Sequence, residues 1–172
     1  MRLFFGLGLS ADEAMALAAW RDRSIQCDGR PVPIANFHMT LAFLGDLQPA
    51  RLDPLLDAAD RQLEAQMSSD RSMTIDQVGY WPKPGIYWAG PSAWPDAVSQ
   101  LADALRGLVV QFGARRERTA FQPHITLFRR CQTPPAAPSV APAIELAAGS
   151  VALFESRQGR EGVSYQPLAE WR

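Results

Sequence analysis

The sequence predicts an α+β fold with two lobes, and two observations carry this prediction. Strand-like and helix-like segments intermingle along the 172 residues, and the motif His-x-Thr-Leu occurs twice, at His38 and at His124, half a chain length apart. A repeat of this kind indicates an internal duplication. We therefore expect a pseudo-symmetric protein in which each lobe is an antiparallel sheet with helices on its outer face, with a cleft between the lobes. Residues 1–172 are expected to form a single two-lobed domain.

Hydrophobic periodicity and capping signals define the elements of the first half. The apolar run over residues 2–9 predicts a strand, and Ser10 followed by acidic residues predicts the N-cap of a helix. The run that holds His38 predicts the next strand. Leucines at helical spacing predict a second helix from about Pro49 to Gln66.

The second half predicts one more helix and several short strands. The helix covers residues 93–113, with Pro95 suited to its first turn and Gly113 to its end. Residues 133–143, rich in Pro and Ala, predict an exposed connection after the strand of the second motif. The other strands are predicted over residues 73–81 and 85–90, as a hairpin, and over residues 144–156 and 163–168.

Composition excludes several classes of protein. The net charge of −1 argues against a general polyanion binder, so any contact with nucleic acid must be local. No apolar stretch approaches the ~18 residues of a membrane span. Cys27 and Cys131 lie far apart in sequence without a Cys-x-x-Cys spacing, and no signal-peptide pattern is present. We expect a reduced, cytoplasmic, monomeric protein with no membrane contact.

Each copy of the motif predicts an imidazole beside a hydroxyl. Residues i and i+2 of a strand point the same way, so His38 emerges next to Thr40, and His124 next to Thr126. The residues between and beyond them are expected to face the core. These are Met39, Leu41, Phe43, Ile125 and Leu127.

Two imidazoles and two hydroxyls that converge on one cleft suit phosphodiester chemistry. An in-line displacement at phosphorus needs a base for the nucleophile and an acid for the leaving oxygen, and histidine serves as either near neutral pH. Threonine hydroxyls can bind the non-bridging oxygens without a metal. No cofactor or metal is therefore expected.

Several blocks of the sequence are similar to one family. The segments RLFFGL, NFHMTLAFLG, VGYW with YWAG, FQPHITLFRR and YQPLAEW occur in order over nearly the full length. With them, the chain resembles the bacterial RNA 2′,3′-cyclic phosphodiesterases of the two-histidine phosphoesterase superfamily, once described as 2′-5′ RNA ligases.

The resemblance implies a function and a role for each motif residue. It implies hydrolysis of an RNA terminal 2′,3′-cyclic phosphate to a 2′-phosphate, at RNA 3′ ends that include tRNA fragments. His38 matches the proton donor to the leaving oxygen, and His124 matches the proton acceptor that activates water. Thr40 and Thr126 match the phosphate-binding threonines. The sequence symmetry alone does not distinguish acid from base.

The resemblance and strand geometry disagree about one substrate-binding arginine. The family has an arginine at the position of Arg129, near the nucleotide. Strict alternation instead puts Arg130 on the face of His124 and Thr126. A bulge, or the end of the strand at Phe128, would reconcile the two.

Other interpretations of these residues stay open. His38, His124, Cys27 and Cys131 are the residue types of a Cys₂His₂ zinc site, although their spacing is wrong for one. The arginine-rich residues 114–118 either guide an RNA backbone or form a solvated turn. Four aromatic residues either stack on a base or belong to the core. They are Trp81, Tyr87, Trp88 and Tyr165.

Two other classes of function also stay open. One is a phosphodiesterase or reversible ligase that acts on 2′-5′ linkages or on small cyclic nucleotides. The other is an RNA-end binder without catalytic activity.

Overall fold

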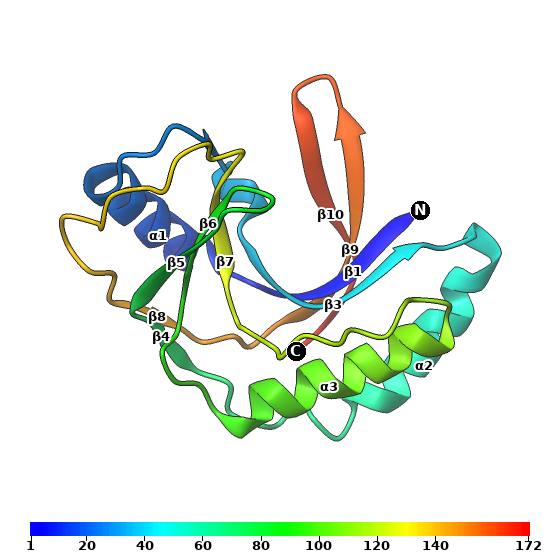
Figure 1. Ribbon diagram of the computed structural model, residues 1–172. Helices are drawn as coiled ribbons and strands as arrows, with labels where there is room; N and C mark the ends of the chain where they lie inside the picture. Colours follow the sequence, from blue (N-terminus) through cyan, green and yellow to red (C-terminus); the bar gives the residue numbers. More distant parts are fainter.

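A computed structural model describes the whole chain, residues 1–172 (Figure 1). The helices are α1 (Ala11–Ser24), α2 (Leu52–Leu63) and α3 (Asp96–Gln111), with short 3-10 turns at Ile34–Asn36 and Pro49–Arg51. The strands are β1 (Arg2–Gly8), β2 (Arg30–Pro31), β3 (His38–Asp46), β4 (Met73–Ile75), β5 (Gln77–Trp81), β6 (Ile86–Gly90), β7 (Ile125–Arg129), β8 (Ile144–Leu146), β9 (Val151–Gly159) and β10 (Gly162–Trp171).

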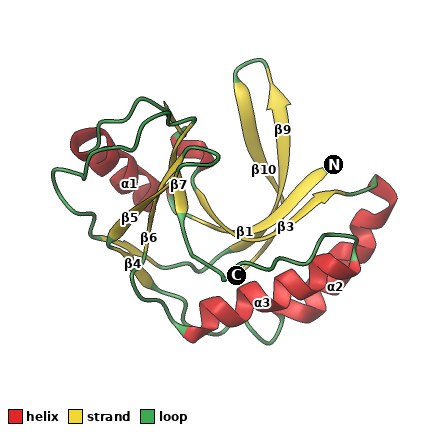
Figure 2. Cartoon of the chain, in the orientation of Figure 1, coloured by secondary structure: helices red, strands yellow, loops and turns green.

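The strands form one antiparallel path that is nearly interrupted in the middle. Its order is β10-β9-β1-β3-β7-β6-β5, with β2 paired to β7, and β4 and β8 form a separate small sheet. Between β3 and β7 the ladder consists of one residue pair, Met39 with Ile125. From this junction the two groups of strands diverge, as Figure 2 shows. The chain thus has the predicted two lobes, one built on β1, β3, β9 and β10 and the other on β5, β6 and β7.

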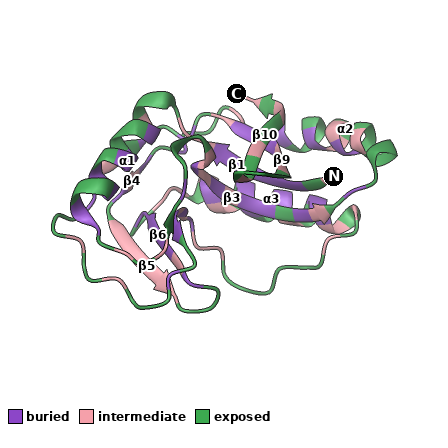
Figure 3. Cartoon of the chain, turned by 90° about the horizontal axis from the view of Figure 1, so that it is seen from above, coloured by how far each residue is buried: buried purple, intermediate pink, exposed green.

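Two of the helices pack on the lobe opposite the strand that precedes them in the sequence. Helix α1 follows β1 in sequence but packs beside β8 on the other lobe, whereas α2 and α3 lie side by side beneath β1 and β3 (Figure 1). No helix is long and apolar enough to cross a membrane. A single cluster of 36 buried residues runs through both lobes and includes Met39 and Ile125. Figure 3 shows that β1 and β3 are buried over much of their length, while the outer turns of α1 and α2 are exposed.

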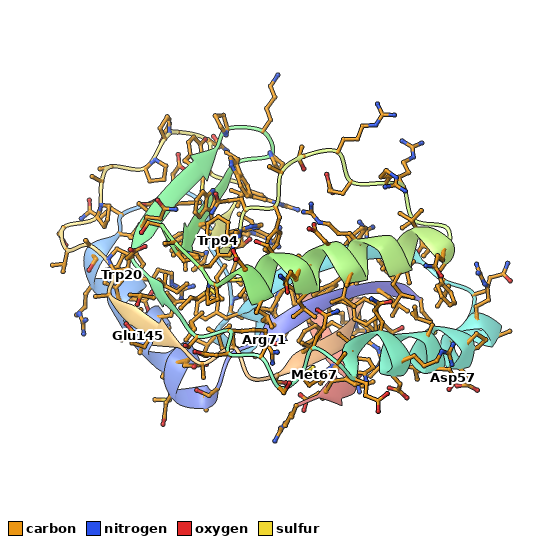
Figure 4. All side chains as sticks on the ribbon, turned by 90° about the horizontal axis from the view of Figure 1, so that it is seen from below. Trp20, Asp57, Met67, Arg71, Trp94 and Glu145 are labelled. Carbon is orange, nitrogen blue, oxygen red and sulfur yellow. The ribbon has the colours of Figure 1, made fainter.

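A buried guanidinium connects the chain after α2 to the segment between β8 and β9. Arg71, 3% exposed, lies between α2 and β4. It donates to the carbonyl of Gln66 at 2.9 Å and to the carbonyl of Ala148, before β9, at 3.0 Å. Figure 4 shows it between Met67, which follows α2, and Glu145 on β8. Since carbonyls accept from the buried charge, these bonds offset part of its desolvation.

The predicted helices are confirmed, with small changes at their ends. Ser10 caps α1 through a capping box, in which its hydroxyl accepts from Glu13 N at 3.1 Å and its N–H donates to the Glu13 carboxylate at 2.8 Å. Helix α2 begins at Leu52, because residues 49–51 form a 3-10 turn. Pro95 is the N-cap of α3 and not a first-turn residue.

Two predicted strands are each divided in the structure. Residues 73–81 form β4 and β5, which belong to different sheets. The chain changes direction at Asp76, whose carboxylate accepts from Ser92 N at 2.7 Å and from its hydroxyl at 2.6 Å. Residues 144–156 form β8 and β9, separated by a bend in which Ala148 has a φ of 49°.

Both motif strands contain a bulge directly after the threonine. The register of β3 against β1 skips Leu41, and the register of β7 against β6 skips Leu127. An extra residue reverses the alternation of faces from that point. Leu41 and Leu127 are buried as expected, but Phe43 is 48% exposed. The expectation that Phe43 faces the core is therefore wrong, because it assumed an unbroken strand.

The junction pair generates a prediction about stability. Ile125→Ala should lower the free energy of unfolding by about 3 kcal/mol, because it leaves a cavity at a fully buried position. Denaturant unfolding measures this loss. Val140→Ala, at a position 62% exposed, is the control and should stay within about 0.5 kcal/mol of the parent. A loss below about 1 kcal/mol for Ile125→Ala would contradict the packing of the junction.

Candidate active site

The junction of β3 and β7 places the two motifs side by side in antiparallel orientation. Met39, which follows His38, pairs with Ile125, which follows His124. Extended by one residue in each direction, this antiparallel register puts Thr40 opposite His124, and His38 opposite Thr126. Each imidazole therefore has its own hydroxyl beside it along the strand and the other motif's hydroxyl across the junction. The structure brings these four sequence-predicted side chains together at the junction of β3 and β7, where Thr40 and His124 also line a cavity.

Both imidazoles are oriented in the same way by the backbone. Nδ1 of His38 lies 2.8 Å from the carbonyl oxygen of Asn36, and Nδ1 of His124 lies 2.8 Å from that of Gln122. Because a carbonyl only accepts, Nδ1 carries the hydrogen in each ring. In the neutral ring the lone pair therefore resides on Nε2. The two carbonyls fix the tautomer needed for proton transfer at Nε2, a feature that the sequence did not reveal.

One contact breaks the symmetry of the two histidines. Nε2 of His38 lies 3.1 Å from the hydroxyl oxygen of Thr40, which donates to the neutral ring. Nε2 of His124 has no protein partner and borders a cavity of about 590 Å³. The free lone pair of His124 is thus open to a small molecule in the cavity.

Aromatic rings enclose each histidine. The His38 ring lies 4.7 Å from the Phe4 ring and 4.8 Å from the Tyr165 ring, centroid to centroid. The Trp81 ring packs against the His124 ring in a T-shaped arrangement, with 4.6 Å between the centroids. Of the proposed stacking residues, Tyr87 is instead buried in the core. Trp81 and Tyr165 use part of their ring surface to pack against the histidines.

Trp88 packs beside His124 and lines the same cavity. The centroids of the two rings lie 6.0 Å apart, and the indole N–H of Trp88 is buried without a hydrogen-bond partner. A Cβ on Gly79 would lie 2.1 Å from the Trp88 ring, so only glycine fits there. The close approach of β5 thus holds this indole in place.

The surroundings lower the pKa of both imidazoles. The pKa of His38 is lowered to about 4, mainly by burial and in smaller part by the charges of Arg129 and His124, against a partial rise from the Asn36 carbonyl. Burial is also the main cause of the lowered pKa of His124, again with a contribution from Arg129. Both rings are neutral at pH 7 before a ligand binds.

The bulge at Leu127 decides which arginine faces the histidines. Arg129 donates from Nη2 to the hydroxyl of Tyr165 at 3.4 Å, and its charge acts on both imidazoles. Arg130 follows the end of β7 with a φ of 57°. The strict alternation that favoured Arg130 fails because of the extra residue.

A buried arginine that the sequence interpretation missed holds this bulge. The carbonyl of Leu127 accepts from Val32 N at 2.8 Å and from Arg21 Nη1 at 3.4 Å. Arg21 also lies over the Phe128 ring, 5.6 Å from its centroid. Its position in the last turn of α1, where basic residues are common, gave no local signal of this role.

The cavity extends from His124 and Thr40 to α3 and the segment before β7. Phe43, unexpected from the sequence, lines it, and so do Arg106 and Arg115. Arg115 belongs to the arginine-rich residues 114–118, and two residues of that segment, Arg115 and Glu117, line the cavity. A cavity lined by an exposed aromatic ring and two guanidinium groups suits a base and a phosphate.

The cysteines form a cluster of their own. Cys27, Asp28 and Cys131 have their ligand atoms within 4.8 Å of one another, and neither histidine belongs to this group. The zinc interpretation that joined both cysteines to both histidines is therefore wrong. The carbonyl contacts of the two Nδ1 atoms explain why the rings point elsewhere.

The fold and site define a two-histidine phosphoesterase class, and comparison with known proteins gives the family. The family model described as LigT-like phosphoesterase matches residues 7–88 and 90–165. The chain belongs to this family.

Similar proteins and structures cover nearly the whole chain. The RNA 2′,3′-cyclic phosphodiesterase of Escherichia coli K12 is 30% identical over 99% of this chain and 95% of its own length. The protein of that name from Thermus thermophilus is 29% identical, over 99% of this chain and 89% of its own. The crystal structure of E. coli LigT complexed with 3′-AMP superposes with a TM-score of 0.82 at 30% identity, over 99% of this chain and 96% of that one.

The lowered pKa of His38 predicts how stability depends on pH. The unfolded chain takes up this proton near pH 6.5 and the folded protein only near pH 4, so stability is lost as the pH falls through this window. The His38 contribution amounts to about 3 kcal/mol. Thermal unfolding of the parent and of His38→Asn from pH 7 to pH 4 measures it, and the variant should lose less. Parallel curves would show that His38 titrates normally.

Proposed function

We propose that this chain, acting as one two-lobed domain over residues 1–172, hydrolyses the 2′,3′-cyclic phosphate at an RNA 3′ end to a 2′-phosphate, without a metal. One observation carries the proposal: two imidazoles, each with Nδ1–H donated to a backbone carbonyl, lie at one strand junction beside two hydroxyls. The name of the E. coli relative supports the same reaction.

The proposed reaction transfers protons at two Nε2 atoms. His124 accepts a proton from a water as the water oxygen attacks phosphorus. The bond from phosphorus to the 3′-oxygen breaks, and His38 gives its proton to that oxygen. The phosphate remains on the 2′-oxygen. A second proton exchange with solvent returns both rings to their starting states.

The hydrogen bonds support this division of roles. His124 has a free Nε2 lone pair at the cavity, as a base requires. His38 must be protonated to act as the acid, and its pKa of about 4 in the empty site is too low for this. A bound phosphodiester anion raises the pKa by placing a negative charge nearby. His38 therefore carries the proton that it must donate only when substrate is present.

The remaining site residues hold the charged group. The hydroxyls of Thr40 and Thr126 donate to the non-bridging oxygens of phosphate, and Thr40 then exchanges its contact with His38 for one with substrate. Arg129, within reach of Tyr165 and both histidines, neutralises the developing charge. Positioning and proton transfer supply the acceleration.

The cavity favours an RNA end over a small cyclic nucleotide. The cavity extends from His124 to Arg106 and Arg115, which offer charge for a further backbone phosphate beyond the cyclic end. The substrates then include the 3′ ends of tRNA fragments, met by a monomer in the cytoplasm. The same space admits a nucleoside hydroxyl in place of water, which would make the reaction a ligation through a 2′-5′ linkage.

Removal of either histidine tests the mechanism. We expect His38→Ala and His124→Ala each to lower turnover of a short RNA with a 2′,3′-cyclic end by roughly 10²–10⁴-fold, because each loses one proton transfer. Phosphorus NMR in excess chelator follows the substrate and distinguishes a 2′-phosphate from a 3′-phosphate product. Turnover at the parent rate in either variant would remove the two-histidine mechanism. Tight binding of the cyclic end without turnover by the parent would favour an RNA-end binder.

The two neighbouring arginines form a matched pair. Arg129→Ala should lower kcat/KM by roughly 10- to 100-fold, since it removes a charged contact to the phosphate. Arg130→Ala, which removes the same charge one residue further on, should change it less than about 2-fold. Equal losses in the two variants would show that only the general charge of this strand end matters.

A further inference from the structure

Two cysteines that are distant in sequence come into contact at the end of β7. The Sγ atoms of Cys27 and Cys131 lie 3.0 Å apart, across a sequence separation of 104 residues. Both are free thiols. In Figure 1 their segments, the loop before β2 and the loop after β7, lie at the top of the lobe that carries α1.

The surrounding backbone holds this contact from both sides. Beyond the pair Arg30 with Arg129, where β2 begins and β7 ends, Asp28 accepts from the N–H groups of Gln132 and Thr133 at 3.0 Å and 3.1 Å. A Cβ on Gly29 would lie 2.7 Å from the sulfur of Cys131, so the turn approaches as closely as a glycine allows.

The same geometry disfavours a metal between the sulfurs. Asp28 is the only other metal-ligating side chain in the cluster, and it also accepts from the Thr133 hydroxyl at 2.9 Å. With its carboxylate occupied by three donors, only two sulfurs remain. Zinc takes four ligands.

We propose that Cys27 and Cys131 are a site of reversible disulfide formation that fastens the start of β2 to the end of β7. The reagent is a low-molecular-weight disulfide such as oxidised glutathione. This site is separate from the histidine cleft and does not depend on the proposed reaction.

The two cysteines differ in access, and this sets the order of events. Cys27 is partly exposed, and its sulfur accepts from Gly29 N at 3.3 Å. It attacks the small disulfide as a thiolate, forms a mixed disulfide and releases one thiol. Cys131, 5% exposed, then loses its proton to the departing thiolate as its sulfur attacks the sulfur of Cys27. Two protein thiols and one small disulfide thus become one protein disulfide and two small thiols.

The protonation state of Cys131 agrees with its role as the second thiol. Burial, together with the neighbouring Cys27 and Asp28, raises the pKa of Cys131 to about 12. It therefore stays protonated until Cys27 is consumed. Once Cys27 is in the mixed disulfide, its contribution to that rise is lost.

The test uses the full chain in excess chelator, first reduced and then incubated with oxidised glutathione. We expect both thiols to disappear in a titration under denaturing conditions, the intact mass to fall by two hydrogen atoms, and dithiothreitol to reverse both changes. Because the closed loop is long, the Tm of the oxidised protein should rise by about 10 °C.

Single serine variants are the matched controls. Cys131→Ser should stop at a glutathione adduct on Cys27, and Cys27→Ser should keep Cys131 free. A parent protein that keeps two free thiols, or that stops at the adduct on Cys27 while Cys131 stays free, would overturn the proposal. Activity in the RNA assay is a separate readout, so failure of one proposal leaves the other untouched.

Discussion

The site depends on a single backbone pair, Met39 with Ile125, at which two lobes meet. Had the ladder between β3 and β7 continued, the strands would have closed the space in which the histidines lie. Had it been absent, no backbone pairing would fix the register of one motif against the other. One antiparallel pair places each threonine opposite the other motif's histidine and leaves the remainder of the two strands free to diverge. The buried side chains on the reverse face tie this pair to the common core.

The enclosure of the histidines has opposite effects on the two steps they are proposed to carry out. Aromatic neighbours and burial keep the rings neutral, which suits a base and works against an acid. The backbone carbonyls of Asn36 and Gln122 partly counter this, because each stabilises the protonated ring. The anionic substrate therefore completes the electrostatics of the site, and ligand charge and ring protonation are linked.

Local patterns in the sequence predicted much of the fold, and the deviations arise where non-local pairing decides. The capping box at Ser10, the three helices and the facing of both His-x-Thr pairs follow from short-range rules. The division at Asp76 depends on β8, some seventy residues later in the chain. The bulges at Leu41 and Leu127 depend on register against β1 and β6, and they determine the positions of Phe43 and Arg129. The contact of Cys27 with Cys131 is likewise set by the fold and not by spacing.

The packing of α1 and α3 on opposite lobes affects how the chain folds and whether half of it can fold alone. Because α1 packs on the lobe opposite its own strand, and α3 does the same in the other direction, neither half of the sequence contains a complete lobe. The first motif packs against residues near the end of the chain, such as Tyr165. Most stabilising contacts therefore join segments that are distant in sequence. Slow folding in one cooperative transition follows from this topology. A fragment that ends between the two motifs would lack a core, although it carries a complete copy of the repeated unit.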